Sequence, residues 1–132
     1  MSMCPQIRYS NGLWYSAEYW SFSIGDETDN FQLSVSGFSG DADDALQFPQ
    51  STTNYGSSAA ANGQKFSTSD MDNDLMNFSN CAQTQGGGWW YGSTCSMPAL
   101  NVDGMAHWYD GRSTQTTAPD IIASMMKIQL AN

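Results

Sequence analysis

Alternating apolar and polar residues predict two neighbouring strands near the start of the chain. Apolar side chains occupy every second position over residues 20–24 and again over residues 31–36, with Ser or Gln between them. This period of two is typical of a half-buried β-strand. The connecting sequence GDETDN and the later Gly37 predict an antiparallel hairpin whose second strand stops at that glycine. The side chains expected on the buried face are Trp20, Phe22, Ile24, Phe31, Leu33 and Val35.

The rest of the chain shows less regular patterning. Met126, Ile128 and Leu130 alternate with polar residues and predict a closing strand, whereas Asp41 predicts the N-cap of a helical turn that reaches Leu46. Residues 49–64 form a loop by composition, and residues 70–120 contain no clear helix or strand period. A long irregular stretch inside a compact domain needs a metal ion, a disulfide or both to organise it.

Composition and charge narrow the possible partners. The 132 residues suffice for one domain, and 13 acidic against 4 basic residues give a net charge of −9. Such a surface repels nucleic acid and anionic membranes, and no stretch approaches the roughly 20 apolar residues of a membrane-spanning helix. Trp and Tyr among Ser, Thr, Asn, Gln and Gly suit recognition of neutral, hydroxyl-rich ligands, but they are equally ordinary in a β-rich secreted domain.

The three cysteines indicate an oxidising environment. Cys81 and Cys95 enclose a loop rich in Gly and Trp, and this spacing predicts a local disulfide and a secreted, extracellular protein. No secretion signal is visible at the N-terminus, so we interpret the chain as a mature or recombinant form. Cys4 is left over near a terminus, either as a free thiol or as an interchain bridge in a homodimer or higher homo-oligomer.

The segment KFSTSDMDNDLMNFSNC carries Asp70, Asp72 and Asp74 at every second position, with no cation among them. Ca²⁺ is the natural counter-ion, because it takes carboxylate, carbonyl and water oxygens as ligands. The pattern is not an EF-hand, since the glycine and the final glutamate of that loop are missing. The alternative is a solvated acidic turn.

Several motifs in one order resemble the fibrinogen-like domain of fibrinogens, ficolins and tachylectin-type invertebrate lectins. They are AEYWSFSIGDETDNFQLSVSGFSGDADDAL, KFSTSDMDND, NCAQ and GGGWWY, followed by MMKIQL near the C-terminus. The resemblance implies an α+β fold with a small antiparallel sheet and a long irregular loop region organised by calcium and a disulfide. It also implies that residues 1–132 form a single fibrinogen-like domain truncated on its N-terminal side.

The resemblance assigns metal ligands residue by residue. The side chains of Asp72 and Asp74 would bind Ca²⁺ directly, and Asp70 would lie next to these ligands without contacting the ion. Backbone carbonyls near Met76 and at Phe78 or Ser79 would complete the site. This chain has one more residue between the last aspartate and Cys81 than the fibrinogen pattern. The resemblance also implies the Cys81–Cys95 disulfide, with a ligand pocket beside it.

The ligand pocket departs further from the family. Ser96 stands where members that bind acetyl groups commonly have His, and the segment NVDGMAHWYDGR replaces the usual Trp-rich stretch. Carboxylates, His and aromatic rings together suit sugar contact. The alternative is that the aromatic rings are core residues and that the Asp-Gly pairs are turns. The candidate contact residues are Asp103, His107, Trp108, Tyr109, Asp110, Gln85 and Ser96, with Arg112 nearby; Trp89 and Trp90 are expected in the core.

These observations predict a calcium-dependent lectin for neutral sugars through vicinal hydroxyls, with galactose-like sugars preferred over N-acetyl sugars. The alternative is an extracellular protein- or peptide-binding module whose calcium is purely structural, and a third possibility is a matrix protein. No hydrolase, zinc-protease or phosphate-loop motif is present, so we expect no enzyme activity.

Overall fold

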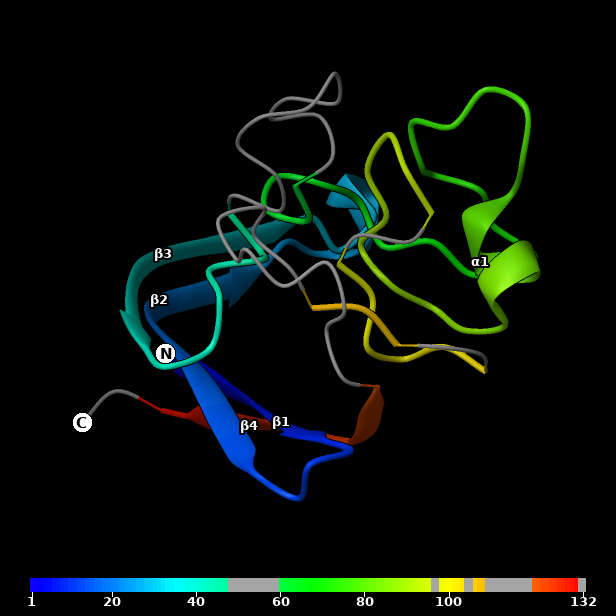
Figure 1. The fold of residues 1–132 in the computed structure, drawn as a ribbon. Coiled ribbons are helices and arrows are strands. Elements are labelled where there is room, and N and C mark those ends of the chain that lie inside the picture. Colours follow the sequence, from blue (N-terminus) through cyan, green and yellow to red (C-terminus); the bar gives the residue numbers. More distant parts are fainter. Residues whose placement is uncertain (48–59, 96–97, 104–105, 109–119, 131–132) are drawn as a thin grey trace.

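The computed structural model describes residues 1–47, 60–95, 98–103, 106–108 and 120–130, and its main feature is one antiparallel sheet (Figure 1). The strand order across this sheet is β3-β2-β1-β4. A short 3-10 helix, η1, follows β2, and α1 lies in the long loop region. The elements are β1 (Ser2–Tyr9), β2 (Trp14–Ile24), η1 (Glu27–Asp29), β3 (Leu33–Gly40), α1 (Cys81–Gln85) and β4 (Ile121–Gln129).

Strand β1 is absent from the sequence-based expectations, although its pattern is plain. Met3, Pro5 and Ile7 are buried and alternate with residues that are half-buried or exposed. β1 lies between β2 and β4, with Met3 opposite Tyr19 on one side and opposite Ile128 on the other. Because proline is depleted in strands, Pro5 makes the alternation of residues 2–9 hard to recognise as a strand.

The predicted hairpin is confirmed, with different bounds. β2 and β3 pair in antiparallel fashion from Ile24 opposite Leu33, and β3 continues past Gly37 to Gly40. The predicted stop at Gly37 is therefore wrong. η1 forms the connection, and the Asp26 carboxylate caps it by accepting hydrogen bonds from two backbone N–H groups of the turn.

The buried face of β2 also differs from the predicted one. Ala17 and Tyr19 are buried, Trp20 is 65% exposed, and Phe22 is buried three positions after Tyr19. Since neighbouring residues of a strand point to opposite faces, the covered face of β2 changes between Tyr19 and Phe22. The expectation that Trp20 and Ile24 face the core is wrong, because Trp20 lies before the point at which the covered face changes and Ile24, at the end of the strand, is 41% exposed.

Two further local predictions fail around β3. Phe31 lies before the strand, with a left-handed φ of 55° and an exposed ring, and is not part of the buried face. Residues 41–46 form bends and a turn rather than a helical turn. Asp41 does not cap a helix, because its Oδ1 instead accepts a hydrogen bond of 2.7 Å from the N–H of Ser16 in β2.

The outer edge of β3 is covered by residues 61–64. The N–H of Leu33 donates to the carbonyl of Gln64 at 2.9 Å, and the N–H of Gly63 donates to the carbonyl of Leu33 at 2.8 Å. The Asn62 side chain extends the pattern, because its Oδ1 accepts from the N–H of Val35 at 2.9 Å. These bonds satisfy edge groups that would otherwise invite another strand.

Strand β4 confirms the predicted closing strand, and its alternating apolar side chains are exposed. Met126 and Ile128 are both exposed, and Leu130 lies beyond the end of the strand. β4 is an edge strand of the sheet, so within the described part of the chain it pairs with one strand only, β1.

Trp89 and Trp90 belong to the core, as expected. Both are buried, and their rings meet edge to face with centroids 5.4 Å apart. The Trp90 indole N–H donates to the carbonyl of Phe31 at 2.9 Å, and the Phe66 ring packs edge to face on Trp90. This aromatic cluster attaches the long loop region to the sheet.

Candidate functional site

The acidic loop, residues 65–80, is fastened to the aromatic core before its aspartates. Ser67 and Trp89 exchange two backbone hydrogen bonds of 3.0 and 3.2 Å, and Thr68 and Met71 close a turn by exchanging two more. The side-chain amide of Asn73 reaches back to the carbonyl of Phe66 at 2.9 Å. The position of the loop therefore depends on the core and not only on its own turns.

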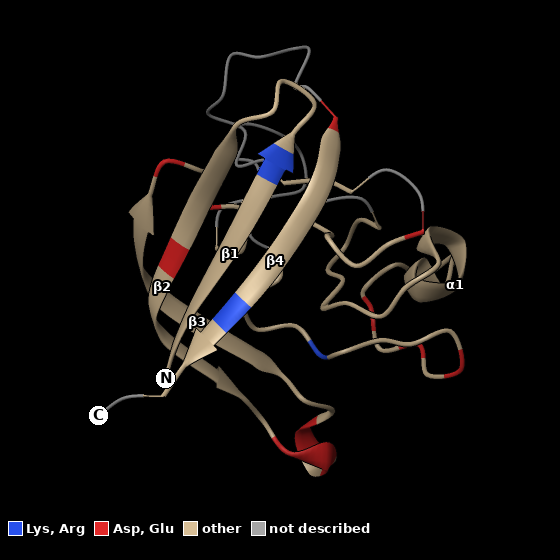
Figure 2. Cartoon of the chain, turned by 90° about the horizontal axis from the view of Figure 1, so that it is seen from below, with Lys and Arg blue, Asp and Glu red and all other residues tan. Residues whose placement is uncertain are grey.

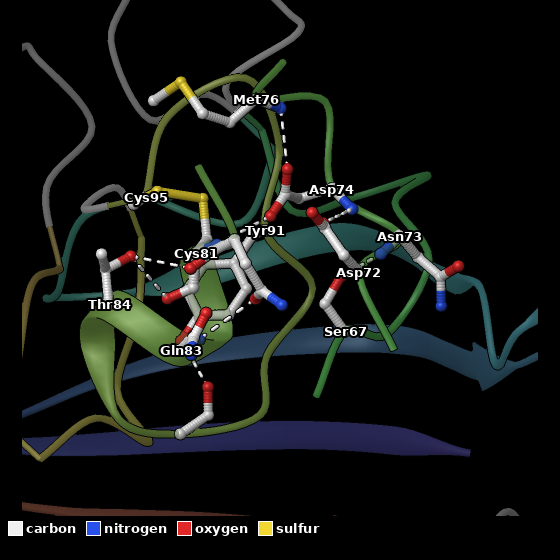
Figure 3. The surroundings of a disulfide bond; sticks show 12 residues. Ser67, Asp72, Asn73, Asp74, Met76, Cys81, Gln83, Thr84, Tyr91 and Cys95 are labelled. Atoms are coloured by element: carbon white, nitrogen blue, oxygen red, sulfur yellow. Dashed lines mark hydrogen bonds between the residues drawn. A yellow bond between two sulfur atoms is a disulfide. The ribbon is translucent and has the colours of Figure 1, made fainter. Parts of the chain in front are cut away.

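Asp74 joins the acidic loop to α1, as Figure 3 shows. Its Oδ1 accepts from the N–H of Met76 at 2.8 Å, and its Oδ2 accepts from the N–H of Cys81 at 2.9 Å. The N–H of Asp74 itself points to Oδ1 of Asp72 at 3.3 Å. Because Cys81 is the first residue of α1, one carboxylate sets the spacing between the loop and the helix.

The predicted Cys81–Cys95 disulfide is confirmed, with 4.9 Å between the two Cα atoms. Asn80 caps α1, because its Oδ1 accepts from the N–H of Gln83 at 3.1 Å while its Nδ2 donates to the carbonyl of Ser69 at 3.0 Å. A helix of five residues does not form by itself in water. The disulfide, the cap and Asp74 together hold it in place.

Negative charge accumulates where the loop meets the helix. Burial raises the pKa of the Asp74 carboxyl, and the adjacent Asp72 raises it further, against the lowering effect of the two N–H donors. Burial, followed by the charge of Asp74, raises the pKa of Tyr91 to about 12. A cation placed near Asp72 and Asp74 would relieve this repulsion and favour their ionised forms.

Asp70 lies apart from this pair. Its Oδ1 accepts a hydrogen bond of 2.7 Å from the Thr68 hydroxyl, and this bond is the largest cause of its lowered pKa. The carboxylate is fully exposed and is engaged within its own turn. The structure thus brings Asp72 and Asp74 together and leaves Asp70 outside the pair.

The residues after Asp74 offer backbone oxygens. Within the described residues, no hydrogen bond ends on the carbonyl oxygens of Met76, Phe78 or Ser79, and the Phe78 side chain is 97% exposed. No group of three or more His, Cys, Asp or Glu side chains in the described ranges is arranged to hold a metal ion. The candidate ligands in the described ranges are thus two adjacent carboxylates and backbone carbonyls, which are oxygen types that Ca²⁺ takes.

Gln85 and Asp103 meet at the end of α1. The N–H of Asp103 donates to the carbonyl of Gln85 at 2.9 Å. Glycines permit this approach: a Cβ on Gly87 would lie 1.8 Å from the carbonyl oxygen of Asn101, and Gly86 ends the helix with a φ of 75°. Two of the predicted ligand residues, one on α1 and one on the following segment, are thereby side by side.

His107 and Trp108 have different surroundings. His107 exchanges two backbone hydrogen bonds with Ala99, and partial burial lowers the pKa of its imidazole. Trp108 is 3% exposed, and its indole N–H donates to the carbonyl of Asp43 at 2.7 Å. The Trp108 ring is a core residue and is not available to stack on a ligand, which corrects the prediction for this residue.

The other predicted ligand residues fall outside the described residues. They are Ser96, Tyr109 and Asp110, together with Arg112. Conversely, the sequence analysis did not identify Asn80 or Tyr91 as residues that shape the site. The Tyr91 hydroxyl donates to the carbonyl of Gly87. The signal for Asn80 was available, since Asn is a favoured N-cap residue directly before a helix. Tyr91 carried no such signal, because its partner is a backbone group four residues earlier.

Sequence comparison matches residues 1–128 to the family described as fibrinogen beta and gamma chains, C-terminal globular domain. The fibrinogen beta chain of Gallus gallus is 39% identical over 105 residues, which are 74% of this chain and 22% of the relative. A techylectin-like protein of Phoneutria nigriventer is 34% identical over 95 residues, covering 72% of this chain and 37% of the relative. The chain therefore spans well under half the length of these curated relatives.

Solved structures share the fold. The fibrinogen-like globe domain of human ANGPTL6 aligns over 98% of this chain and 57% of its own, with a TM-score of 0.66 and 23% identity. A lamprey fibrin D-dimer, solved with the peptide Gly-His-Arg-Pro-amide, aligns over 89% of this chain and 36% of its own, with a TM-score of 0.67 and 24% identity. Among the helices in the described residues, none is both long and apolar enough to cross a membrane.

Proposed function

Because this chain belongs to the family of fibrinogen C-terminal globular domains, whose members generally act as binding modules rather than enzymes, we propose that it is an extracellular, calcium-dependent lectin. Its ligand would be a neutral sugar held through vicinal hydroxyls, galactose-like in preference to N-acetylated. The techylectin-like relative supports this class of function. The observation that carries the proposal is the link from Asp72 through Asp74 to Cys81, since it connects the acidic pair to the helix that bears Gln85.

Calcium would be held by the side chains of Asp72 and Asp74 with carbonyl oxygens from Met76, Phe78 or Ser79. The fit rests on the adjacent carboxylates and on the carbonyls that accept no other hydrogen bond in the described part of the chain. When bound, the ion would supply positive charge and open coordination positions for hydroxyl oxygens.

The sugar would lie beside the ion, on the surface formed around the end of α1. Gln85 and Asp103 are already adjacent, and both carry groups that hydrogen-bond hydroxyls. His107 would present an imidazole that is neutral at physiological pH, because partial burial lowers its pKa. Ser96, Tyr109 and Asp110 remain proposed contacts.

A protein- or peptide-binding role is the second candidate. The lamprey fibrin structure of this fold was solved with a bound peptide, and that observation favours it. In this alternative calcium would be purely structural. Chelation separates the two, because a sugar held by the ion is released in EDTA, whereas a peptide module would lose stability first.

The test is binding of the whole chain to an immobilised glycan panel, first with calcium and then with EDTA. We expect binding to a terminal galactose-like sugar that EDTA abolishes and added calcium restores. Asp72→Asn should abolish this binding, while Glu27→Gln, an exposed acidic change in η1, should leave it intact. Absence of glycan binding in calcium by a folded protein would overturn the lectin proposal and favour a protein partner.

A further inference from the structure

Strand β2 presents two large aromatic rings on the sheet face opposite the buried side chains of Ala17 and Tyr19. Trp14 is 47% exposed and Trp20 is 65% exposed. They are six positions apart, so both side chains point to the same face of the strand. At about 3.3 Å per residue, their Cα atoms lie roughly 20 Å apart along it. Figure 2 shows β2, β1 and β4 side by side in front, with the loop region behind them.

Polar residues lie between the two rings. Ser16 and Glu18 are on the same face of β2, because they share its alternation with Trp14 and Trp20. On the neighbouring strand β1, Gln6 is opposite Ser16 and Arg8 is opposite Trp14. The surface therefore has an indole at each end, hydroxyl and carboxylate groups between them on β2, and an amide and a guanidinium group beside them on β1. We call these six residues the Trp14–Trp20 face: Gln6, Arg8, Trp14, Ser16, Glu18 and Trp20.

Each of the two residues has a neighbour on the sheet without being buried. The Arg8 guanidinium lies 6.0 Å from the centre of the Trp14 ring, and its Nε donates to the carbonyl of Gly12 at 3.4 Å. Trp20 lies over Gly37 on β3, where an added Cβ would come within 3.2 Å of the Trp20 Cβ. Side chains that are already ordered lose less conformational freedom when a ligand binds.

The chemistry of this face distinguishes among possible ligands. A protein interface or a lipid surface would favour a continuous apolar patch, whereas polar groups separate these two rings. The charges of Glu18 and Arg8 have opposite signs, although the chain as a whole carries −9. Acidic residues gather instead in η1 and the loops, as Figure 2 shows. A nearly neutral face with flat rings and hydrogen-bonding groups matches an uncharged, flat, hydroxyl-rich ligand.

We propose that the Trp14–Trp20 face binds an extended, uncharged oligosaccharide, independently of calcium. The two indoles would stack on the C–H faces of separated sugar rings, while Gln6, Ser16 and Glu18 would hydrogen-bond hydroxyls of the rings between them. This site is separate from the acidic loop and does not rest on the function proposed for that loop.

The experiment is isothermal titration of the whole chain with cellohexaose, laminarihexaose and hexa-N-acetylchitohexaose, in EDTA throughout. We expect at least one hexasaccharide to bind, and Trp14→Ala or Trp20→Ala to weaken its binding about tenfold each, which corresponds to about 1.4 kcal/mol. Trp20→Phe, which keeps a ring, should lose much less. Gln6→Ala, which alters neither ring, should weaken binding about threefold.

Ile128→Ala is the matched control. Ile128 is 55% exposed on a strand of the same sheet, but its partner Met3 is buried, so it belongs to the opposite face. Its hexasaccharide affinity should equal that of the wild type. Thermal unfolding checks each variant, and the exposed tryptophans should leave it unchanged.

Failure of all three hexasaccharides to bind the folded wild type at millimolar concentration would overturn the proposal. Unchanged affinity in the two Trp→Ala variants would do the same. Sedimentation of Trp20→Ala adds a third arm: loss of a dimer with no change in sugar affinity would identify a second copy as the occupant and overturn the oligosaccharide proposal. Because EDTA is present, these outcomes are independent of whether the acidic loop binds sugar.

Discussion

At the scale of single residues, Asp74 should matter most to the acidic loop. Its carboxylate accepts hydrogen bonds from two backbone N–H groups, one in the loop and one in α1. Asp74→Ala removes both acceptors, and we expect the free energy of unfolding to fall by about 1–3 kcal/mol in urea titrations. Asp70→Ala is the control, because Asp70 is fully exposed and bonds only within its own turn. Equal losses in the two variants would contradict this role.

His107 should make stability depend on pH near neutrality. Burial lowers the pKa of its imidazole below the ordinary 6.5, so the unfolded chain binds the proton more tightly than the folded one. The stabilisation is therefore fully present above about pH 6.5 and is lost as pH falls toward the lowered folded-state value. We expect urea midpoints to drop between pH 7.5 and 5.5 in calcium-free buffer.

His107→Gln tests that assignment. Gln retains a polar side chain of similar reach but does not titrate, so the variant should show a flatter stability profile over the same pH range. A slope in the variant equal to that of the wild type would place the titrating group elsewhere.

At the scale of elements, alternation predicted the β2–β3 hairpin, the closing strand and the burial of Phe22, Leu33 and Val35, but not the exposure of Trp20 and Ile24. The reason lies in β2, where the covered face changes between Tyr19 and Phe22. A period of two assumes that one face stays covered along the whole strand. Trp20 therefore matches the expected alternation, but the face to which it points is exposed at that position.

The candidate site shows the same difference between features that depend on sequence spacing, which could be predicted, and features that depend on packing, which could not. The Cys81–Cys95 pair was readable from spacing, and the disulfide forms. The burial of Trp108 could not be predicted from the sequence, because its indole N–H bonds to the carbonyl of Asp43, which lies 65 residues earlier in the chain. Likewise, no local pattern could show that Asp74 accepts the N–H of Cys81, since that bond exists only once the loop and α1 are packed together.

The Cys81–Cys95 disulfide should hold the loop and α1 together. Its two cysteines are 14 residues apart, and a closed loop of that size contributes about 3 kcal/mol on the chain-entropy model. We expect the double variant Cys81→Ser, Cys95→Ser to lose roughly that much unfolding free energy. Cys4→Ser is the matched control and should lose little, because Cys4 forms no disulfide within the chain. A double variant as stable as the wild type would show that packing alone suffices.

At the scale of the whole molecule, Cys4 offers a covalent route to a dimer. It is half-buried in β1, and burial, followed by the charge of Glu18, raises the pKa of its thiol against the opposite effect of Lys127. Since the thiolate is the reactive form, oxidation should be slow at neutral pH and faster above pH 9. We expect a dimer band on non-reducing electrophoresis that Cys4→Ser removes. A dimer that persists in Cys4→Ser would have another origin.

The most direct measurement is a calorimetric titration of calcium into the metal-free chain, with Asp72→Asn and Glu27→Gln titrated in parallel. The proposed ligands are two adjacent carboxylates, linked to α1 through Asp74, and carbonyl oxygens that accept no hydrogen bond within the described ranges. We expect saturable binding in the wild type and in Glu27→Gln, and its loss in Asp72→Asn. Calcium binding that is absent from the wild type, or that survives unchanged in Asp72→Asn, would contradict the assignment of the acidic loop as the metal site.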